Sequence, residues 1–225
     1  MRTVLKLGGF AFSDTQHDSF IQQYVDLLKQ LSAEHHVTVI AGGGTIARSY
    51  INSARKMGVP ESLCDQLGIL VSRLNARLLA DGLAEHAYPE IPTTVSELKH
   101  YFASGKIVAM GGLQPGHSTN AVAAIAAETV KAEIFVNATD VDGVYTSDPS
   151  KDQTARRLDE ITTAQLAKIL SGGELTAGTY DLMDPIALRI IERSRIPTII
   201  IDGRTPTNVL KALRKEKTGT RILFE

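Results

Sequence analysis

Three strand-like apolar runs in this 225-residue chain end in glycine: Gly8-Gly9, Gly42-Gly43-Gly44 and Gly111-Gly112. Without a Cβ atom, the backbone N–H groups of glycine can come close to an anion, and a helix start adds partial positive charge. Ligands of open α/β sheets bind beyond the carboxyl ends of the strands, so three such ends would hold a chain of phosphates. The alternative is that all three are ordinary strand-to-helix turns.

Lys6 lies in the first of these runs, Thr3–Leu7, directly before the glycine pair. A lysine inside an otherwise buried strand is costly unless its charge is used. At the carboxyl end of the sheet its ammonium group would reach the β- and γ-phosphates of ATP and offset the charge of the moving phosphoryl group. Arg48, one helical turn after Gly44, is a second candidate cation. Alternatively, the ammonium group of Lys6 extends into solvent at the edge of the sheet, and Arg48 is a solvated arginine on a helix.

The loop after the third glycine pair is the most specific local feature. Pro115 and Gly116 set a turn, and Ser118 or Thr119 would cap the alanine-rich helix that follows. Their hydroxyls and the free N–H groups of a helix start suit the phosphate of an acceptor. His117 could donate a hydrogen bond to it, although a lone histidine in a loop is more often structural.

The polar stretch Thr139–Pro149 follows the next strand-like run and contains several aspartates. Near phosphates these carboxylates need a cation, and Mg²⁺ that arrives with ATP meets this need because phosphates supply part of its coordination. Tyr145 would stack on the adenine or hydrogen-bond to it, and a solvated hairpin is the alternative. No histidines have the spacing of zinc ligands, so we expect no fixed metal site.

Two better-known nucleotide motifs do not fit. The P-loop sequence G-x-x-x-x-G-K-[ST] is absent, because Gly105-Lys106 is followed by Ile107. The run 42–47 matches the looser dinucleotide fingerprint, which requires an acidic residue at the end of a second strand ~20 residues on. Asp65 has about this spacing, but no strand pattern precedes it. The pattern therefore disfavours a dehydrogenase.

The elements that must position these residues are short apolar strands that alternate with amphipathic helices. Such alternation predicts one α/β domain with parallel strands and helices on both sheet faces. We expect strands at 3–7, 37–41, 88–91, 107–110, 133–138, 198–201 and 221–224. We expect helices at 20–31, 45–57, 61–86, 95–103, from 118 or 119, and at 163–170, 185–193 and 208–214.

Composition excludes several other classes of protein. Apolar residues make up 43% of the chain and the formal net charge is −1, so neither a nucleic-acid groove nor a membrane-binding face is expected. The single cysteine, Cys64, excludes a disulfide within the chain. The first residues lack the pattern of a signal peptide, and the apolar stretch 121–130 is too short to span a bilayer. We therefore expect a cytoplasmic protein.

Taken together, the runs KLGG, AGGGTIAR, MGGLQPGHSTNAVAA and NATDVDGVYTSDP, in this order, resemble the amino-acid kinase family. Within that family the PGHST run is most similar to archaeal-type uridylate kinases, and the resemblance covers nearly the whole chain. It implies a three-layer αβα sandwich with a mainly parallel sheet. It also implies the reaction ATP + UMP → ADP + UDP, with Mg²⁺ carried by ATP.

The resemblance also implies roles for individual residues. Lys6 and Arg48 would be catalytic. ATP would contact Gly8, Gly9, Phe10, Gly44, Arg48, Thr139, Tyr145 and Asp148. UMP would contact Gly43, Asp65, Leu113, Gln114, Pro115, Gly116, His117, Ser118 and Thr119, with Asp65 on the ribose hydroxyls. Residues 1–135 would form mainly the acceptor side and residues 136–225 mainly the ATP side. Relatives form hexamers built from dimers, and the long helix with Leu67, Leu70 and Leu74 is the expected dimer face.

Four positions depart from the family pattern. Asn120 stands where many relatives have an aspartate that orients the catalytic lysine, and Phe10 replaces the usual serine, so its ATP contact would come from the backbone. Thr45 replaces a lysine, and Leu113-Gln114 replaces a polar residue and a histidine. Two alternatives stay open: a carbamate, N-acetylglutamate or isopentenyl phosphate kinase on the same scaffold, or a non-catalytic nucleotide storage or sensor protein, which Asn120 favours.

Overall fold

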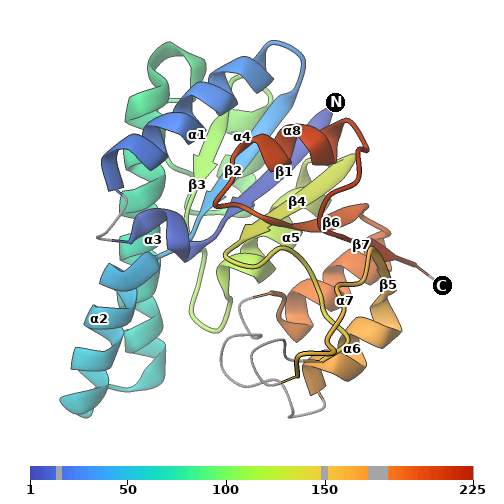
Figure 1. The fold of residues 1–225 in the computed structure, drawn as a ribbon. Helices are drawn as coiled ribbons and strands as arrows, with labels where there is room; N and C mark the ends of the chain where they lie inside the picture. The colour runs from blue at the N-terminus through green and yellow to red at the C-terminus, as the bar shows by residue number, and fades with distance from the viewer. Residues whose placement is uncertain (14–16, 148–151, 172–181, 225) are drawn as a thin grey trace.

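The computed structural model describes residues 1–13, 17–147, 152–171 and 182–224, which form one sheet with helices on both faces (Figure 1). The seven described strands lie in the order β3-β2-β1-β4-β6-β7-β5. Each neighbouring pair is parallel except β6 and β7. The strands are β1 (Arg2–Leu7), β2 (His36–Ala41), β3 (Val108–Met110), β4 (Ile134–Thr139), β5 (Glu160–Thr162), β6 (Thr198–Asp202) and β7 (Thr220–Leu223).

The helices fall where the apolar periodicity predicts them, with end points that differ by a few residues. The α-helices are α1 (His17–Ser32), α2 (Gly44–Lys56), α3 (Glu61–Leu83), α4 (Val95–Phe102), α5 (Thr119–Thr129), α6 (Thr163–Ser171), α7 (Pro185–Ser194) and α8 (Thr207–Leu213). Two short 3-10 helices, η1 (Gly9–Phe12) and η2 (Ala84–His86), follow β1 and α3.

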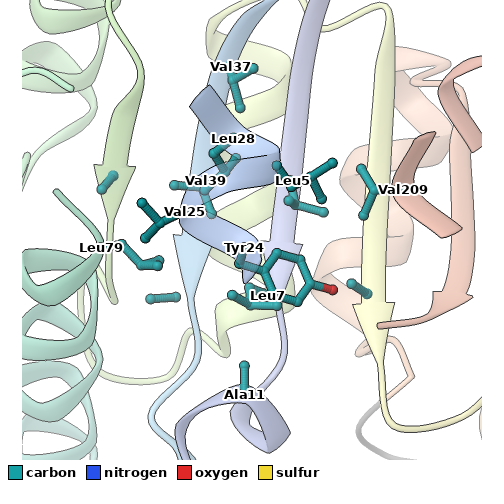
Figure 2. Packing of buried hydrophobic residues seen from close by; sticks show 14 of the residues in the cluster. Leu5, Leu7, Ala11, Tyr24, Val25, Leu28, Val37, Val39, Leu79 and Val209 are labelled. Atoms are coloured by element: carbon teal, nitrogen blue, oxygen red, sulfur yellow. The ribbon is translucent and has the colours of Figure 1, made fainter. Parts of the chain in front are cut away.

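Alternation along the buried strands divides the core into two clusters. Successive side chains of a strand point to opposite faces, so Leu5 and Leu7 enter one cluster and Val4 enters the other. The first cluster includes Tyr24 and Leu28 of α1, which pack over the sheet (Figure 2), together with residues of α3 and α8. The second includes residues of α4, α5, α6 and α7. These two helical layers around a mainly parallel sheet confirm the predicted αβα sandwich.

Three expectations about the elements are corrected. Residues 88–91 form no strand: Pro89 lacks an N–H donor, and the structure shows only a bridge between Ala87 and Ile107. Helix α3 stops at Leu83, because Ala84 takes a positive φ of 51° that ends the helix. The three-residue strand β5, paired with β7 at the sheet edge, was not expected, since so short a run carries little periodic signal.

The strand order places a crevice between β1 and β4. From β1 the chain first adds β2 and β3 on one side of the sheet, and it then crosses to add β4 on the other side. Such a reversal of strand order opens a ligand site beyond the carboxyl ends of the strands. The glycine turns after β1 and β2 lie at this edge of the sheet, as does the polar stretch after β4. Helix α2 lies beside α3, away from the middle of the sheet (Figure 1).

Candidate active site

A cavity of about 260 Å³ lies at this edge of the sheet. It brings together residues that are far apart in the sequence, from the ends of β1 and β4, the starts of α2 and α5, and the side of α3. The predicted site residues that line it are Lys6, Gly8, Gly9, Phe10, Gly43, Gly44, Arg48, Asp65, His117, Ser118, Thr119 and Thr139. Most of the predicted acceptor and ATP residues therefore converge on one space.

Among the residues that the structure describes, five predicted ones are not in the lining of that cavity. The acceptor-loop residues Leu113, Gln114, Pro115 and Gly116 precede the part of the loop that reaches it. Tyr145 also lies outside the lining, and its hydroxyl donates a hydrogen bond of 2.9 Å to the Asp142 carboxylate, which raises the pKa of Tyr145 together with burial. Asp148 falls outside the described residues, so its contact with ATP stays a prediction.

Lys6 is buried beneath this cavity, with 5% of its surface exposed. Its neighbours across the strands are Ile40 and Asn137, and alternation places it on the same face as Val4, the face that α5 covers. Its side chain and the first residues of α5 line the same space. This burial argues against an ammonium group that escapes to bulk solvent, and the catalytic role of Lys6 stays a prediction.

The first two glycine turns pack directly on each other. The N–H of Gly42 donates to the carbonyl of Leu7 at 2.9 Å, and a Cβ on Gly42 would lie 2.7 Å from the Gly9 nitrogen. Gly44 has a φ of 68°, and a Cβ there would collide with the carbonyl of Phe12. Gly42 and Gly44 must therefore be glycine for the turn after β2 to approach the turn after β1. This close contact places the backbone of both turns beside the cavity.

The third glycine pair, Gly111-Gly112, packs closely against helix α3. A Cβ on Gly111 would lie 2.5 Å from the backbone nitrogen of Arg73, and one on Gly112 would lie 2.8 Å from Cγ1 of Ile69. Only Gly112 of the pair lines the cavity. The close packing of α3 therefore accounts for both glycines. The N–H of Gly112 donates to the hydroxyl oxygen of Ser72 at 2.8 Å, so the structure does not support the anion-binding interpretation of this pair.

Helix α5 starts at the cavity and is capped as the sequence predicts. The hydroxyl oxygen of Ser118 accepts hydrogen bonds from the N–H groups of Asn120 and Ala121 at 3.0 and 3.1 Å, and it donates to the carboxylate of Asp184. This hydroxyl is thus engaged within the protein. The N–H of Thr119, the first residue of the helix, has no intrahelical acceptor and is oriented for an anion.

Asp184 was not identified from the sequence, although Asp184-Pro185 before an apolar helix is a recognisable start signal. Its carboxylate accepts from the N–H groups of Ile186 and Ala187 at 2.8 and 2.9 Å and thereby caps α7. Since it also accepts from Ser118, this one carboxylate joins the N-termini of α5 and α7. Two helix starts are held together beside the cavity.

The aromatic ring of Phe10, which stands where the family pattern has a serine, packs among neighbouring side chains and glycines at this edge of the sheet. Its ring packs edge-to-face on Phe20, with centroids 5.9 Å apart. A Cβ on Gly8 would lie 2.9 Å from this ring, and one on Gly203 would lie 2.5 Å from it. The ring fills the space between the strand ends, so the backbone of Phe10 is the part suited to contact a ligand.

Two carboxylates, Asp65 and Asp140, also line the cavity. One oxygen of Asp65 accepts from the N–H of Gly116 at 2.8 Å. In the described parts of the chain no cluster of three or more His, Cys, Asp or Glu residues could hold a metal by itself. One or two carboxylates beside substrate phosphates are nevertheless the surroundings in which proteins bind Mg²⁺.

No helix within the described ranges is long and apolar enough to span a membrane.

Comparison with known proteins agrees with this geometry. The model of the amino acid kinase family matches residues 1–202. A uridylate kinase of Methanothermobacter thermautotrophicus is 46% identical over 226 residues, covering 100% of both chains, and one of Methanobrevibacter smithii is 40% identical over 99% of both. The crystal structure of uridylate kinase from Archaeoglobus fulgidus superposes with a TM-score of 0.89 at 40% identity, covering 99% of this chain and 100% of that one.

A more distant structure shares the fold. The UMP kinase of Bacillus anthracis has a TM-score of 0.80 at 22% identity and covers 98% of this chain and 95% of its own. The family match spans most of the chain, and the two archaeal relatives are similar over nearly their full length. The chain belongs to the amino acid kinase family.

Proposed function

We propose that this protein transfers the γ-phosphate of ATP to UMP, which gives ADP and UDP, a step of pyrimidine nucleotide synthesis. Its full-length relatives at 40–46% identity are named uridylate kinases. The observation that carries the proposal is the buried Lys6 in a cavity that the start of α5 also lines. A buried cation and free helix N–H groups facing one space suit phosphoryl transfer and not hydride transfer.

In this reaction a phosphate oxygen of UMP attacks the γ-phosphorus, and the bond from that phosphorus to the β-bridging oxygen breaks as ADP leaves. The protein supplies position and charge, because phosphoryl transfer needs little covalent help. Lys6 acts on the transferring group from beneath, and Arg48 is the second cation at the start of α2. The N–H groups of Thr119, Gly9 and Gly44 bind phosphate oxygens, whereas those of Gly8 and Gly42 donate to backbone carbonyls of the strand ends.

The two substrates would divide the cavity between them. UMP occupies the end formed by Gly43, Asp65 and residues 113–119, with the free oxygen of Asp65 on the ribose hydroxyls. ATP lies over the turn Gly8–Phe10 and contacts Gly44, Thr139, Tyr145 and Asp148. Residues 1–135 thus serve mainly the acceptor and residues 136–225 mainly ATP. Mg²⁺ neutralises phosphate charge when it is bound, and Asp140 is the carboxylate at the ATP end that could join its coordination.

A dimer that assembles further into a hexamer is the proposed form. Helix α3 exposes a leucine row at helical spacing that the chain itself leaves open to solvent, with Leu70 at 60% and Leu74 at 66% exposure. Leu63 and Leu78 extend this row. Apolar rows of this size favour burial against a second copy. Light scattering on the purified protein would measure the mass of this assembly.

We also propose that the protein is cytoplasmic.

The acceptor is tested by ADP release from ATP and Mg²⁺ in the presence of UMP, CMP, dTMP, carbamate, N-acetylglutamate or isopentenyl phosphate. We expect release with UMP well above that with every other acceptor. Turnover with another acceptor but not with UMP would assign the protein to a different kinase of this scaffold. ATP binding without release for any acceptor would favour a storage or sensor protein, for which the buried amide of Asn120 at the cavity is the one supporting observation.

A further inference from the structure

One side of helix α3 is hydrogen-bonded to the backbone of two glycine turns. The amide nitrogen of the buried Asn75 side chain donates to the carbonyl of Gly42 at 2.8 Å. The hydroxyl oxygen of Ser72 accepts from the N–H of Gly112 at 2.8 Å. This helix therefore does more than cover the sheet, because it also fixes backbone that borders the cavity.

Arg73 makes the most specific of these contacts. Its Nε donates to the carbonyl of Gly112 at 2.8 Å, and its Nη2 donates to the carbonyl of Leu113 at 2.9 Å. These are consecutive carbonyls at the start of the acceptor loop. Because a trans peptide is planar, with its N–H opposite its C=O, this contact also turns the N–H groups of Leu113 and Gln114 away from Arg73. The guanidinium group thus sets two successive peptide planes.

The far part of the same loop is fastened to the same helix. Gly116, at a φ of 80°, donates its N–H to Asp65, which lies two turns before Arg73 on α3. Two residues later Ser118 caps α5. The loop 112–116 is therefore held at its start by Arg73 and near its end by Asp65, so the helix fixes its path between the sheet and α5.

We propose that Arg73 is a positioning residue for the phosphate acceptor, which holds the loop 112–116 in the conformation that receives UMP. This inference rests on the proposed function for the identity of the acceptor. Arginine suits the task because its planar guanidinium group presents two donors in a fixed fork, whereas lysine offers a single flexible ammonium group. Arg73 is not in the lining of the cavity, so it acts through the loop.

The test compares Arg73→Met and Arg73→Lys with Arg77→Met. Arg77 lies one turn further along α3, and its guanidinium group donates to Asp81 and to the carbonyl of Pro89, away from the cavity. Titration calorimetry measures the Kd for UMP and, separately, for a non-hydrolysable ATP analogue. Hydrogen exchange of peptides that cover residues 111–117 measures the order of the loop in the absence of any ligand.

We expect Arg73→Met to weaken UMP binding about tenfold and to leave the Kd of the ATP analogue within about twofold, since two hydrogen bonds from a charged group are lost. Exchange in residues 111–117 should become faster. Arg73→Lys should recover part of both effects, and Arg77→Met should show neither. If Arg73→Met proves too unstable to purify, Arg73→Lys carries the same comparison with smaller shifts.

Three results would overturn the assignment. These are unchanged UMP binding in Arg73→Met, an equal loss for both nucleotides, or exchange rates of the loop that match those of the parent protein. Failure of the parent protein itself to bind UMP would refute the proposed acceptor instead. In that case the exchange measurement still decides whether Arg73 orders the loop.

Discussion

The two ends of the cavity are fixed by different kinds of interaction. At the acceptor end, side chains of α3 bind backbone groups of residues 112–116 through one buried, two partly buried and one exposed hydrogen bond. At the ATP end, the N–H of Gly203 donates to the carbonyl of Thr139 at 2.8 Å, and nearby carboxylates pair with arginines at the surface. Exposed ion pairs contribute little stability, so the acceptor end should be the more rigid and the more sensitive to substitution.

Lys6 lies between the two ends and should give the largest effect. We expect Lys6→Ala to lower kcat by about a hundredfold to a thousandfold, because a preorganised charge next to the transferring group is lost. The Kd for UMP should change by less than about threefold, since this charge acts mainly in the transition state. Stopped-flow ADP release and calorimetry measure the two quantities. A variant with parental kcat would remove Lys6 from the mechanism.

Gly111→Ala probes the acceptor end through packing alone. A Cβ atom at this position would lie 2.5 Å from the backbone of Arg73, so α3 and the loop must separate. We expect a loss of roughly 1–3 kcal/mol in the free energy of unfolding, together with a several-fold rise in KM for UMP. Urea denaturation and steady-state kinetics measure the two effects.

Gly82→Ala is the matched control for this substitution. It lies near the end of the same helix, away from the cavity, and its new Cβ would meet only the methyl groups of Val25, the nearer at 3.1 Å, and no backbone. We expect an unchanged KM for UMP in this variant. Equal changes in KM for the two glycine variants would show that the contact of Gly111 with α3 has no particular role in acceptor binding.

Tyr145→Phe probes the ATP end. It removes the hydrogen bond to Asp142 but keeps the ring. We expect the KM for ATP to rise by no more than about threefold and the KM for UMP to stay constant, since a single partly buried hydrogen bond contributes only about 1 kcal/mol. A rise in the KM for UMP larger than that for ATP would contradict the division of the cavity into two ends.

The smallest effect should come from Arg204→Met. Burial pushes the pKa of Asp202 upward, but hydrogen bonds from the side chain and backbone of Arg204 outweigh it, so this pKa lies below its ordinary value of 3.8. A lowered carboxylate pKa stabilises the fold fully above the ordinary value, and this stabilisation is lost as the pH falls through the lower, folded-state pKa.

In the Arg204→Met variant this contribution should shrink by less than about 1 kcal/mol, because the ion pair is partly exposed. Urea denaturation at neutral pH and at successive values below pH 4 measures the change. A pH dependence of unfolding identical to that of the parent protein would show that Arg204 does not set the pKa of Asp202.

Much of the fold follows from local sequence signals. The buried strands β1, β2 and β6 are short β-rich apolar runs, and α3 shows leucines at helical spacing, so each is visible without tertiary information. The edge strand β5 is not visible, because its three residues acquire strand geometry only by pairing with β7. The end of α3 at Ala84 likewise depends on a positive φ that no residue type announces.

The site was predictable where glycine and charge stand close together in the chain. Lys6 and its glycine pair are an example, since a lysine in a buried strand needs a physical reason. The role of Arg73 and the contact of Asp184 with Ser118 were not predictable, because each joins residues that are distant in sequence. The local cap that Asp184 forms on α7 does carry a sequence signal. Gly111 shows the converse: its residue type suggested anion binding, while the structure explains it by the approach of α3.

The central claim is that the γ-phosphate of ATP is transferred to UMP in this cavity. Incubation with γ-labelled ATP, Mg²⁺ and UMP, followed by separation of the nucleotides, tests it most directly. We predict that the label appears in UDP in amounts equal to the ADP formed, and that Lys6→Ala abolishes nearly all of it. Label that is released as inorganic phosphate, or that stays in ATP, would contradict the claim.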